Sequence, residues 1–164
     1  VQSATDDLFY INHAVDKSYF SGGSIFSQRY NTTTFQDSMT VLYGHNSRSQ
    51  AMFAQLNNFA DASFFEQNQS IYIYTPEKVY EYQIFAAYPH SSDHLLLCND
   101  FNDPEQFAAY FDSLADGVNC NYRRDLFPQF GDNVLTLSTC YRQNRTQRFL
   151  VQGVLTQEYT VLKK

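Results

Sequence analysis

The sequence predicts a single, mainly β domain with short helices, spanning residues 1–164. Aromatic residues make up 17% of the chain, with 13 Tyr and 15 Phe, a bias that is typical of strands. Several apolar runs have the length of strands, and helical periodicity is confined to short stretches. A chain of this size buries about two thirds of the surface that it exposes when unfolded, so it can fold without a disulfide or a metal.

The first part of the chain predicts two strands separated by loops. Residues 1–19 are mostly polar around the aromatic run LFYIN, which we interpret as a loop followed by a brief helix or strand. Gly22 and Gly23 permit a turn into a strand at 24–30, SIFSQRY. A polar loop rich in Thr and Asn then leads into the strand MTVLYGH at 39–45.

The middle of the chain predicts helical turns and then a β-hairpin. The apolar residues of 52–59 have helical spacing, Ser49 is a suitable N-cap, and residues 62–65 add a further helical turn. Strands at 70–74 and 79–88, rich in Tyr, Ile, Val and Phe, flank the turn sequence TPEK. This pattern predicts two antiparallel neighbours in a sheet.

A long connection at 89–132 separates the hairpin from the next strand. Asp103 and Pro104 are suited to the N-cap and the first position of a helix, and apolar residues at helical spacing continue until Gly117. A helix inside such a connection indicates an elaborated loop and not a second domain. Loops of this kind often carry substrate contacts.

Charge and cysteine content exclude several classes of function. The net charge of −6 and a pI near 5.0 argue against a nucleic-acid partner, which needs a basic face. No run of about 18 apolar residues predicts a membrane span, and the first residues lack the pattern of a signal peptide. Three cysteines without a CxxC pair make a structural zinc site improbable, and an odd thiol can be reactive.

Three apolar runs have a chemically capable side chain at one end. NVLTLSTC ends at Cys140, TVLYGH ends at His45, RFLVQGVL begins at Arg148, and a last run, EYTVL, predicts a final strand. Taken alone, the thiol is ordinarily a buried structural group, and His45 and Arg148 are ordinary polar residues. Together they predict acyl transfer, which needs a nucleophile, an acid or base, and a donor for the oxyanion.

These residues resemble the signature of class B sortases, the cysteine transpeptidases of Gram-positive bacterial surfaces. The resemblance rests on TLSTC at 136–140, on LYGHN at 42–46 and on the arginine that opens RFLVQGVL. GSIF at 23–26, the STC form of the cysteine motif and the helix in the connection before it are similar to class B in particular. The similarity extends from about residue 6 to residue 162.

The resemblance implies a closed sortase-type β-barrel and a role for each of the three residues. Cys140 would attack the carbonyl of the threonine in a C-terminal sorting signal and form a thioester. His45 would protonate the leaving amine and later accept a proton from the incoming amine. Arg148 would hold the substrate carbonyl and stabilise the oxyanion. Arg142 and Arg145 are its rivals, but they lie in a loop, which is less preorganised than the start of a strand.

Further positions match the substrate groove of the family. Each also has an ordinary interpretation as loop polarity or core packing, so the resemblance alone carries them. Tyr141 stands where relatives often have an acidic residue. The expected contacts with the sorting peptide are Asp7, Ile11, Ser92, Leu96, Leu97, Ser138, Thr139 and Tyr141.

The implied partners are secreted proteins with a C-terminal sorting motif, and an amine of a peptidoglycan precursor or of a pilin as acceptor. No cofactor and no metal are implied. The implied location is the extracellular face of the cell membrane, through an N-terminal anchor that these residues do not include; a preceding helix and a first barrel strand are missing too. A pilin-polymerising sortase and an inactive sortase-like binding module stay open. A papain-like peptidase is disfavoured because His45 precedes Cys140.

Overall fold

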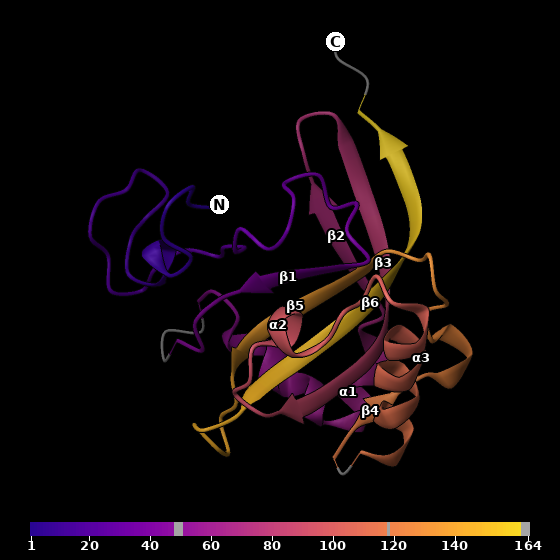
Figure 1. Ribbon diagram of the computed structural model, residues 1–164. Coiled ribbons are helices and arrows are strands. Elements are labelled where there is room, and N and C mark those ends of the chain that lie inside the picture. Colours follow the sequence, from indigo (N-terminus) through magenta and orange to yellow (C-terminus); the bar gives the residue numbers. More distant parts are fainter. Residues whose placement is uncertain (48–50, 118, 162–164) are drawn as a thin grey trace.

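A six-stranded sheet forms the centre of the molecule (Figure 1). The computed structural model describes residues 1–47, 51–117 and 119–161. The strand order is β1-β5-β6-β3-β2, with β4 beside β3; β1 and β5 are parallel and the other neighbours are antiparallel. The strands are β1 Met39–Tyr43, β2 Ser70–Tyr74, β3 Lys78–His90, β4 Asn121–Tyr122, β5 Val134–Cys140 and β6 Arg148–Thr160. The predicted mainly β class with short helices is confirmed.

The sheet is open, whereas the sequence predicted a closed barrel, and this detail of the prediction is corrected. Its hydrogen-bonded order has two ends, β1 and β2. The strand expected at 24–30 is reduced to two isolated bridges. Phe26 and Tyr43 exchange hydrogen bonds of 3.0 and 2.7 Å beside β1, and Ser27 pairs with Gln2. The strand does not extend because the chain next to the Phe26 bridge bonds to another loop: the Ser24 amide donates to the Tyr10 carbonyl at 2.9 Å.

The hairpin forms as predicted, and the last two expected strands are one. β2 and β3 pair from Tyr74 opposite Val79, and the Thr75 amide donates to the Lys78 carbonyl at 2.8 Å to close the turn. The run EYTVL is not a separate strand, because β6 continues without a break to Thr160. β3 is equally long and supplies partners for β6 along its whole length.

Short helices surround the sheet. Asp103 caps α3 by accepting a hydrogen bond from the Gln106 amide at 2.8 Å, and Pro104 opens the helix, as the sequence predicts. The helix expected over 52–59 is a 3-10 helix, and its expected cap, Ser49, lies outside the described residues. The helices are η1 Phe9–Ile11, η2 Ala54–Ala60, α1 Ala62–Gln67, α2 Leu95–Cys98, α3 Pro104–Ser113, η3 Leu114–Asp116 and η4 Arg124–Leu126.

The sheet separates two hydrophobic clusters, and the alternation along β5 assigns its residues to them. Val134 packs in the cluster that contains Phe107 and Phe111 of α3, whereas Leu135 and Leu137 pack in the other cluster. The even-numbered positions of β5, and those of β6 as far as Val154, therefore face the α3 side of the sheet. At the ends of these strands, the same face presents Cys140 and Arg148.

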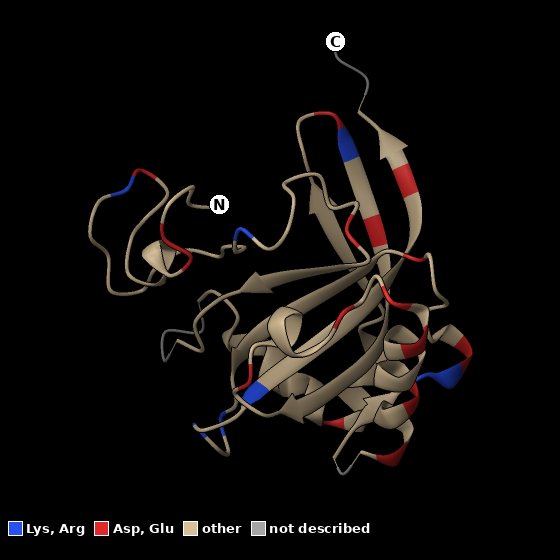
Figure 2. Ribbon diagram, in the orientation of Figure 1, with Lys and Arg blue, Asp and Glu red and all other residues tan. Residues whose placement is uncertain are grey.

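Charged side chains are spread over the surface. Figure 2 shows acidic residues around α3 and along the hairpin end of the sheet, with Lys and Arg scattered among them. Within residues 1–47, 51–117 and 119–161, no helix is both long enough and apolar enough to span a membrane.

Candidate active site

Cys140 and Arg148 are opposite each other at the end of the β5–β6 pair. The antiparallel register pairs the two residues directly, so their side chains share one face of the sheet. Arg148 Nη1 lies 3.5 Å from Cys140 Sγ. The guanidinium is thus held beside the sulfur by two regular strands, and not by a loop.

His45 reaches the same place from β1. The parallel register places Tyr43 beside Ser138 of β5, two residues before Cys140. The connection continues past the strand end, because the Gly44 amide donates to the Ser138 carbonyl at 3.1 Å and the Thr139 hydroxyl donates to the Gly44 carbonyl at 2.7 Å. These bonds fix the position of His45 relative to the cysteine strand.

The three side chains line one cavity of about 230 Å³. The cavity is bounded by the N-terminal segment (residues 1–37), the end of β1, the connection that follows β3, and the paired ends of β5 and β6. A thiol, an imidazole and a guanidinium that converge on a partly enclosed space can carry out acyl transfer. The lining residues are Leu8, Ile11, Phe26, Gln28, Val41, Tyr43, Gly44, His45, His90, Ser92, Asp93, His94, Leu95, Ser138, Thr139, Cys140, Arg148 and Leu150.

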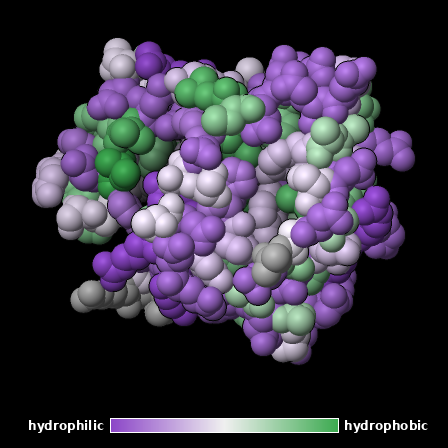
Figure 3. Space-filling view, turned by 60° about the horizontal axis from the view of Figure 1, so that its bottom comes forward, coloured by the Kyte–Doolittle hydropathy of each residue, from purple (hydrophilic) through white to green (hydrophobic). Residues whose placement is uncertain are grey.

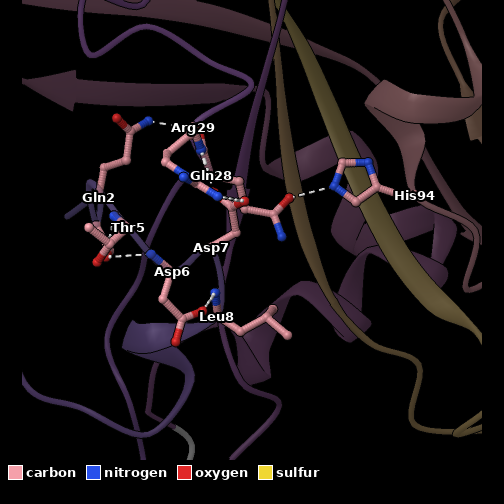
Figure 4. A network of polar contacts seen from close by, with 9 residues as sticks. Gln2, Thr5, Asp6, Asp7, Leu8, Gln28, Arg29 and His94 are labelled. Carbon is pink, nitrogen blue, oxygen red and sulfur yellow. Dashed lines mark hydrogen bonds and ion pairs between the residues drawn. The ribbon is translucent and has the colours of Figure 1, made fainter.

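Polar contacts brace the N-terminal segment internally and join it to the connection after β3 (Figure 4). Arg29 donates to both carboxylate oxygens of Asp7, at 3.1 and 3.0 Å, and these hydrogen bonds hold the pKa of Asp7 below its usual value. The Gln2 side chain donates to the Gln28 carbonyl at 2.8 Å. Gln28 Oε1 lies 2.6 Å from His94 Nε2, which joins the segment to the connection after β3.

The backbone at Cys140 is fixed by two asparagine side chains. The amides of Asn46 and Asn57 donate to the Cys140 carbonyl at 3.0 and 3.2 Å. Asn57 Oδ1 accepts the Arg142 backbone amide at 2.7 Å, and the Arg142 guanidinium donates to the Ala54 carbonyl at 3.1 Å. Arg142 therefore braces the loop after Cys140, and the cavity lining includes Arg148 and neither rival arginine.

The structure brings half of the expected peptide contacts to the cavity. Ile11, Ser92, Ser138 and Thr139 line it. The other four do not line it. One forms an ion pair, two line a second pocket and one packs in the core. They are Asp7, Leu96, Leu97 and Tyr141.

Each of these four placements has a local cause. Asp7 is paired with Arg29, as described above. Only the first residue of α2, Leu95, lines the active-site cavity, while Leu96 and Leu97 line a separate pocket on the other side of this helical turn. Tyr141 follows Cys140 and so faces the opposite side of the sheet, where its ring is 6% exposed and stacks on Phe149 at 5.3 Å.

Sequence reasoning missed several residues that line the cavity. His90 is paired with Arg148 across β3 and β6, and His94 belongs to the loop that follows. Burial raises the pKa of Tyr43 to about 12, although the nearby Arg148 guanidinium acts in the opposite direction. His90 and His94 lie in a polar stretch whose pattern does not show which way the side chains point.

In the described part of the chain, no cluster of three or more His, Cys, Asp or Glu residues could hold a metal ion.

The N-terminal segment also carries exposed apolar side chains. On the left of Figure 3, where this segment lies, hydrophobic residues gather on the surface. Leu8, Val15, Phe20 and Ile25 are all more than a third exposed. Phe26, by contrast, is buried and stacks on Tyr43 of β1, so apolar packing as well as polar contacts holds this wall of the cavity.

Comparison with known proteins assigns a family to this arrangement. A family model described as a sortase domain matches residues 9–156. Sortase B of Listeria monocytogenes is 27% identical over 157 residues, which cover 94% of this chain but 63% of that protein. The X-ray structure of Clostridium perfringens sortase B is similar with a TM-score of 0.83 and 29% identity, covering 96% of this chain and 85% of the other. The crystal structure of a Streptococcus pyogenes class B sortase involved in pilus biogenesis gives a TM-score of 0.79 at 27% identity, covering 95% and 83%.

Proposed function

Because the chain belongs to the sortase family, we propose that it is a class B cysteine transpeptidase that cleaves a C-terminal sorting signal after threonine. One observation carries the proposal: the Cys140 sulfur lies 3.5 Å from the Arg148 guanidinium, in a cavity that His45 also lines. The chain spans 63% of the length of its Listeria relative, so we also propose, and do not carry over from that relative, the substrate and the partners.

The first half of the reaction forms a thioester. Cys140 gives its proton to His45, and its sulfur attacks the carbonyl carbon of the substrate threonine. Arg148 N–H groups stabilise the negative charge that develops on the carbonyl oxygen. The bond between the threonine and the following residue breaks. His45 gives its proton to the departing amine, so the leaving fragment is a neutral amine and the donor stays bound to sulfur.

The second half transfers the donor to an amine. The nitrogen of the acceptor attacks the thioester carbonyl, His45 takes the proton that this nitrogen loses, and the bond to Cys140 breaks. The donor would be a secreted protein with a sorting motif, and the acceptor an amine of a peptidoglycan precursor. This chemistry fits an enzyme at the extracellular face of the cell membrane. A pilin amine as acceptor is the second candidate, since one similar structure is described as a sortase involved in pilus biogenesis.

The test is to trap the thioester. The protein is incubated with peptides of the NPxTN, SPxTG and LPxTG types, and intact-mass spectrometry reads the mass added to the chain. We expect an adduct on Cys140 with one of these peptides and none in Cys140→Ala. Cys98→Ala is the matched control, because Cys98 is exposed and lies outside the cavity, and it should form the adduct.

Two results would contradict the proposed transpeptidase activity. If no peptide forms an adduct in the wild type or in Cys98→Ala, the chain is not an active transpeptidase of these motifs. Peptide binding without an adduct, measured by calorimetry, would instead support the sortase-like binding module.

A further inference from the structure

The imidazole of His45 is held by the backbone of the N-terminal segment. His45 Nε2 lies 2.6 Å from the carbonyl oxygen of Ile11. A carbonyl oxygen carries no proton, so Nε2 must be the donor in this hydrogen bond. While the contact holds, Nε2 keeps its hydrogen whether the ring is neutral or charged, and only Nδ1 can gain or lose a proton.

We infer that the Ile11 carbonyl is a positioning group for His45, which fixes the orientation of the ring and leaves Nδ1 as the nitrogen that exchanges protons in the cavity. The inference deepens the proposed function and rests on it for the role of His45. In the first half of the reaction, Nδ1–H gives its proton to the leaving amine. In the second half, neutral Nδ1 takes the proton of the incoming amine, and the proton on Nε2 stays in place throughout.

The position of the Ile11 carbonyl depends on a glycine. Gly23 has φ +58°, and its amide donates to the Phe20 carbonyl at 2.8 Å. A Cβ atom at this position would lie 2.5 Å from the Ile11 oxygen and 2.6 Å from the Tyr10 oxygen, closer than real Cβ atoms come. The backbone at residue 23 therefore packs directly against the oxygen that binds His45, and any other residue there must displace it.

A second set of bonds ties the same loop together. The Ser24 amide donates to the Tyr10 carbonyl at 2.9 Å, and the Ser24 hydroxyl donates to the His13 carbonyl at 2.9 Å. The Ile11 amide donates to the Leu8 carbonyl at 3.0 Å within η1. The oxygen that accepts from His45 is thus presented by a loop with defined backbone geometry.

The first test uses Gly23→Ala, with Gly131→Ala as the matched control. Gly131 also has a positive φ, +103°, but a Cβ there meets nothing within 4 Å, so the control reproduces the backbone strain without moving Ile11. The readout is the Nε2–H proton of His45 in NMR spectra of protein labelled with ¹⁵N-histidine, assigned by its loss in His45→Gln. We expect a downfield signal in the wild type and in Gly131→Ala, and its loss in Gly23→Ala.

The second test weakens the acceptor without adding an atom. Replacing Asn12 by its α-hydroxy acid turns the Ile11–Asn12 amide into an ester, whose carbonyl is a poorer acceptor. The Nε2–H signal should move upfield. In both variants kcat/KM for a sorting peptide should fall by roughly tenfold or more, because misplacing a general acid and base costs a large part of its contribution.

The outcomes separate this inference from the proposed function. An unchanged Nε2–H signal and an unchanged kcat/KM, in a Gly23→Ala protein and an ester protein that both unfold at the wild-type temperature, would overturn the inference. If the wild type turns over no sorting peptide, the proposed function fails, while the NMR signal still decides whether Ile11 holds the ring.

Discussion

Arg148 is the residue whose removal tests the proposed chemistry most directly. Its guanidinium lies 3.5 Å from the Cys140 sulfur, and the strand register holds both side chains on one face. An oxyanion donor of this kind contributes about 10²–10³ to kcat, equivalent to about 2.7–4 kcal/mol of transition-state stabilisation. We expect Arg148→Ala to lose kcat/KM in this range.

Arg148→Lys should recover only part of this loss. A lysine keeps the positive charge, but it presents a single ammonium group and cannot direct two N–H groups at one oxygen. We therefore expect its activity to lie between those of the wild type and Arg148→Ala. The assay is steady-state cleavage of a fluorescence-quenched sorting peptide, with thermal unfolding of each variant to exclude a loss of fold.

Arg145→Ala is the matched control for this experiment. Arg145 lies in the loop between β5 and β6, is exposed and does not line the cavity, so its removal changes the net charge equally. It should stay within about twofold of the wild type, as surface substitutions away from a site usually do. Wild-type activity in Arg148→Ala, or an equal loss in Arg145→Ala, would refute the assignment of Arg148.

Three further predictions concern the fold and the other thiols. Phe107→Ala should lower the free energy of unfolding by about 3–5 kcal/mol in urea titrations, because Phe107 is 1% exposed in the cluster around α3. The control is Phe130→Ala, which removes an exposed ring in contact with Phe107 and should lower the free energy of unfolding far less. Asp103→Ala should lower stability by about 1 kcal/mol through loss of the α3 cap, and Asp103→Asn should retain most of it. Burial raises the pKa of Cys120 to about 11, so its alkylation by iodoacetamide should be slow at pH 8 and accelerate as the pH rises towards 11. Peptide maps measure the labelling of each cysteine. Equal labelling of Cys120 and the exposed Cys98 at pH 8 would contradict this expectation.

The part of the site on β5 and β6 could be predicted because it depends on local patterns. The two-residue period assigns each strand residue to a face, and a short polar turn between two apolar runs makes them antiparallel neighbours. The same period places Tyr141 on the face opposite Cys140, so the expected peptide contact at Tyr141 conflicted with a rule available from the sequence. The structure places Tyr141 on that opposite face, against Phe149.

The rest of the site could not be predicted because its contacts join distant parts of the chain. Gln28 meets His94 across 66 residues, and His45 meets Ile11 across 34, through single hydrogen bonds that leave no periodic signal. The same limit explains the expected strand at 24–30. Its apolar residues favour a strand, but whether a strand forms depends on a neighbour with free backbone groups, and Ser24 is already bonded to Tyr10.

Cys140 and Arg148, the proposed nucleophile and oxyanion donor, stand on strands whose faces pack into two hydrophobic clusters, and we expect this part of the site to open last. The His45 imidazole is bonded to the Ile11 carbonyl, in a segment that carries exposed apolar side chains, and a single hydrogen bond contributes little net stability. Movements of the N-terminal segment would therefore change the proton transfers at His45 while the Cys140–Arg148 pair stays intact. In the proposed mechanism, the thioester would therefore form on the sheet, whereas the proton transfers would depend on a loop of the N-terminal segment.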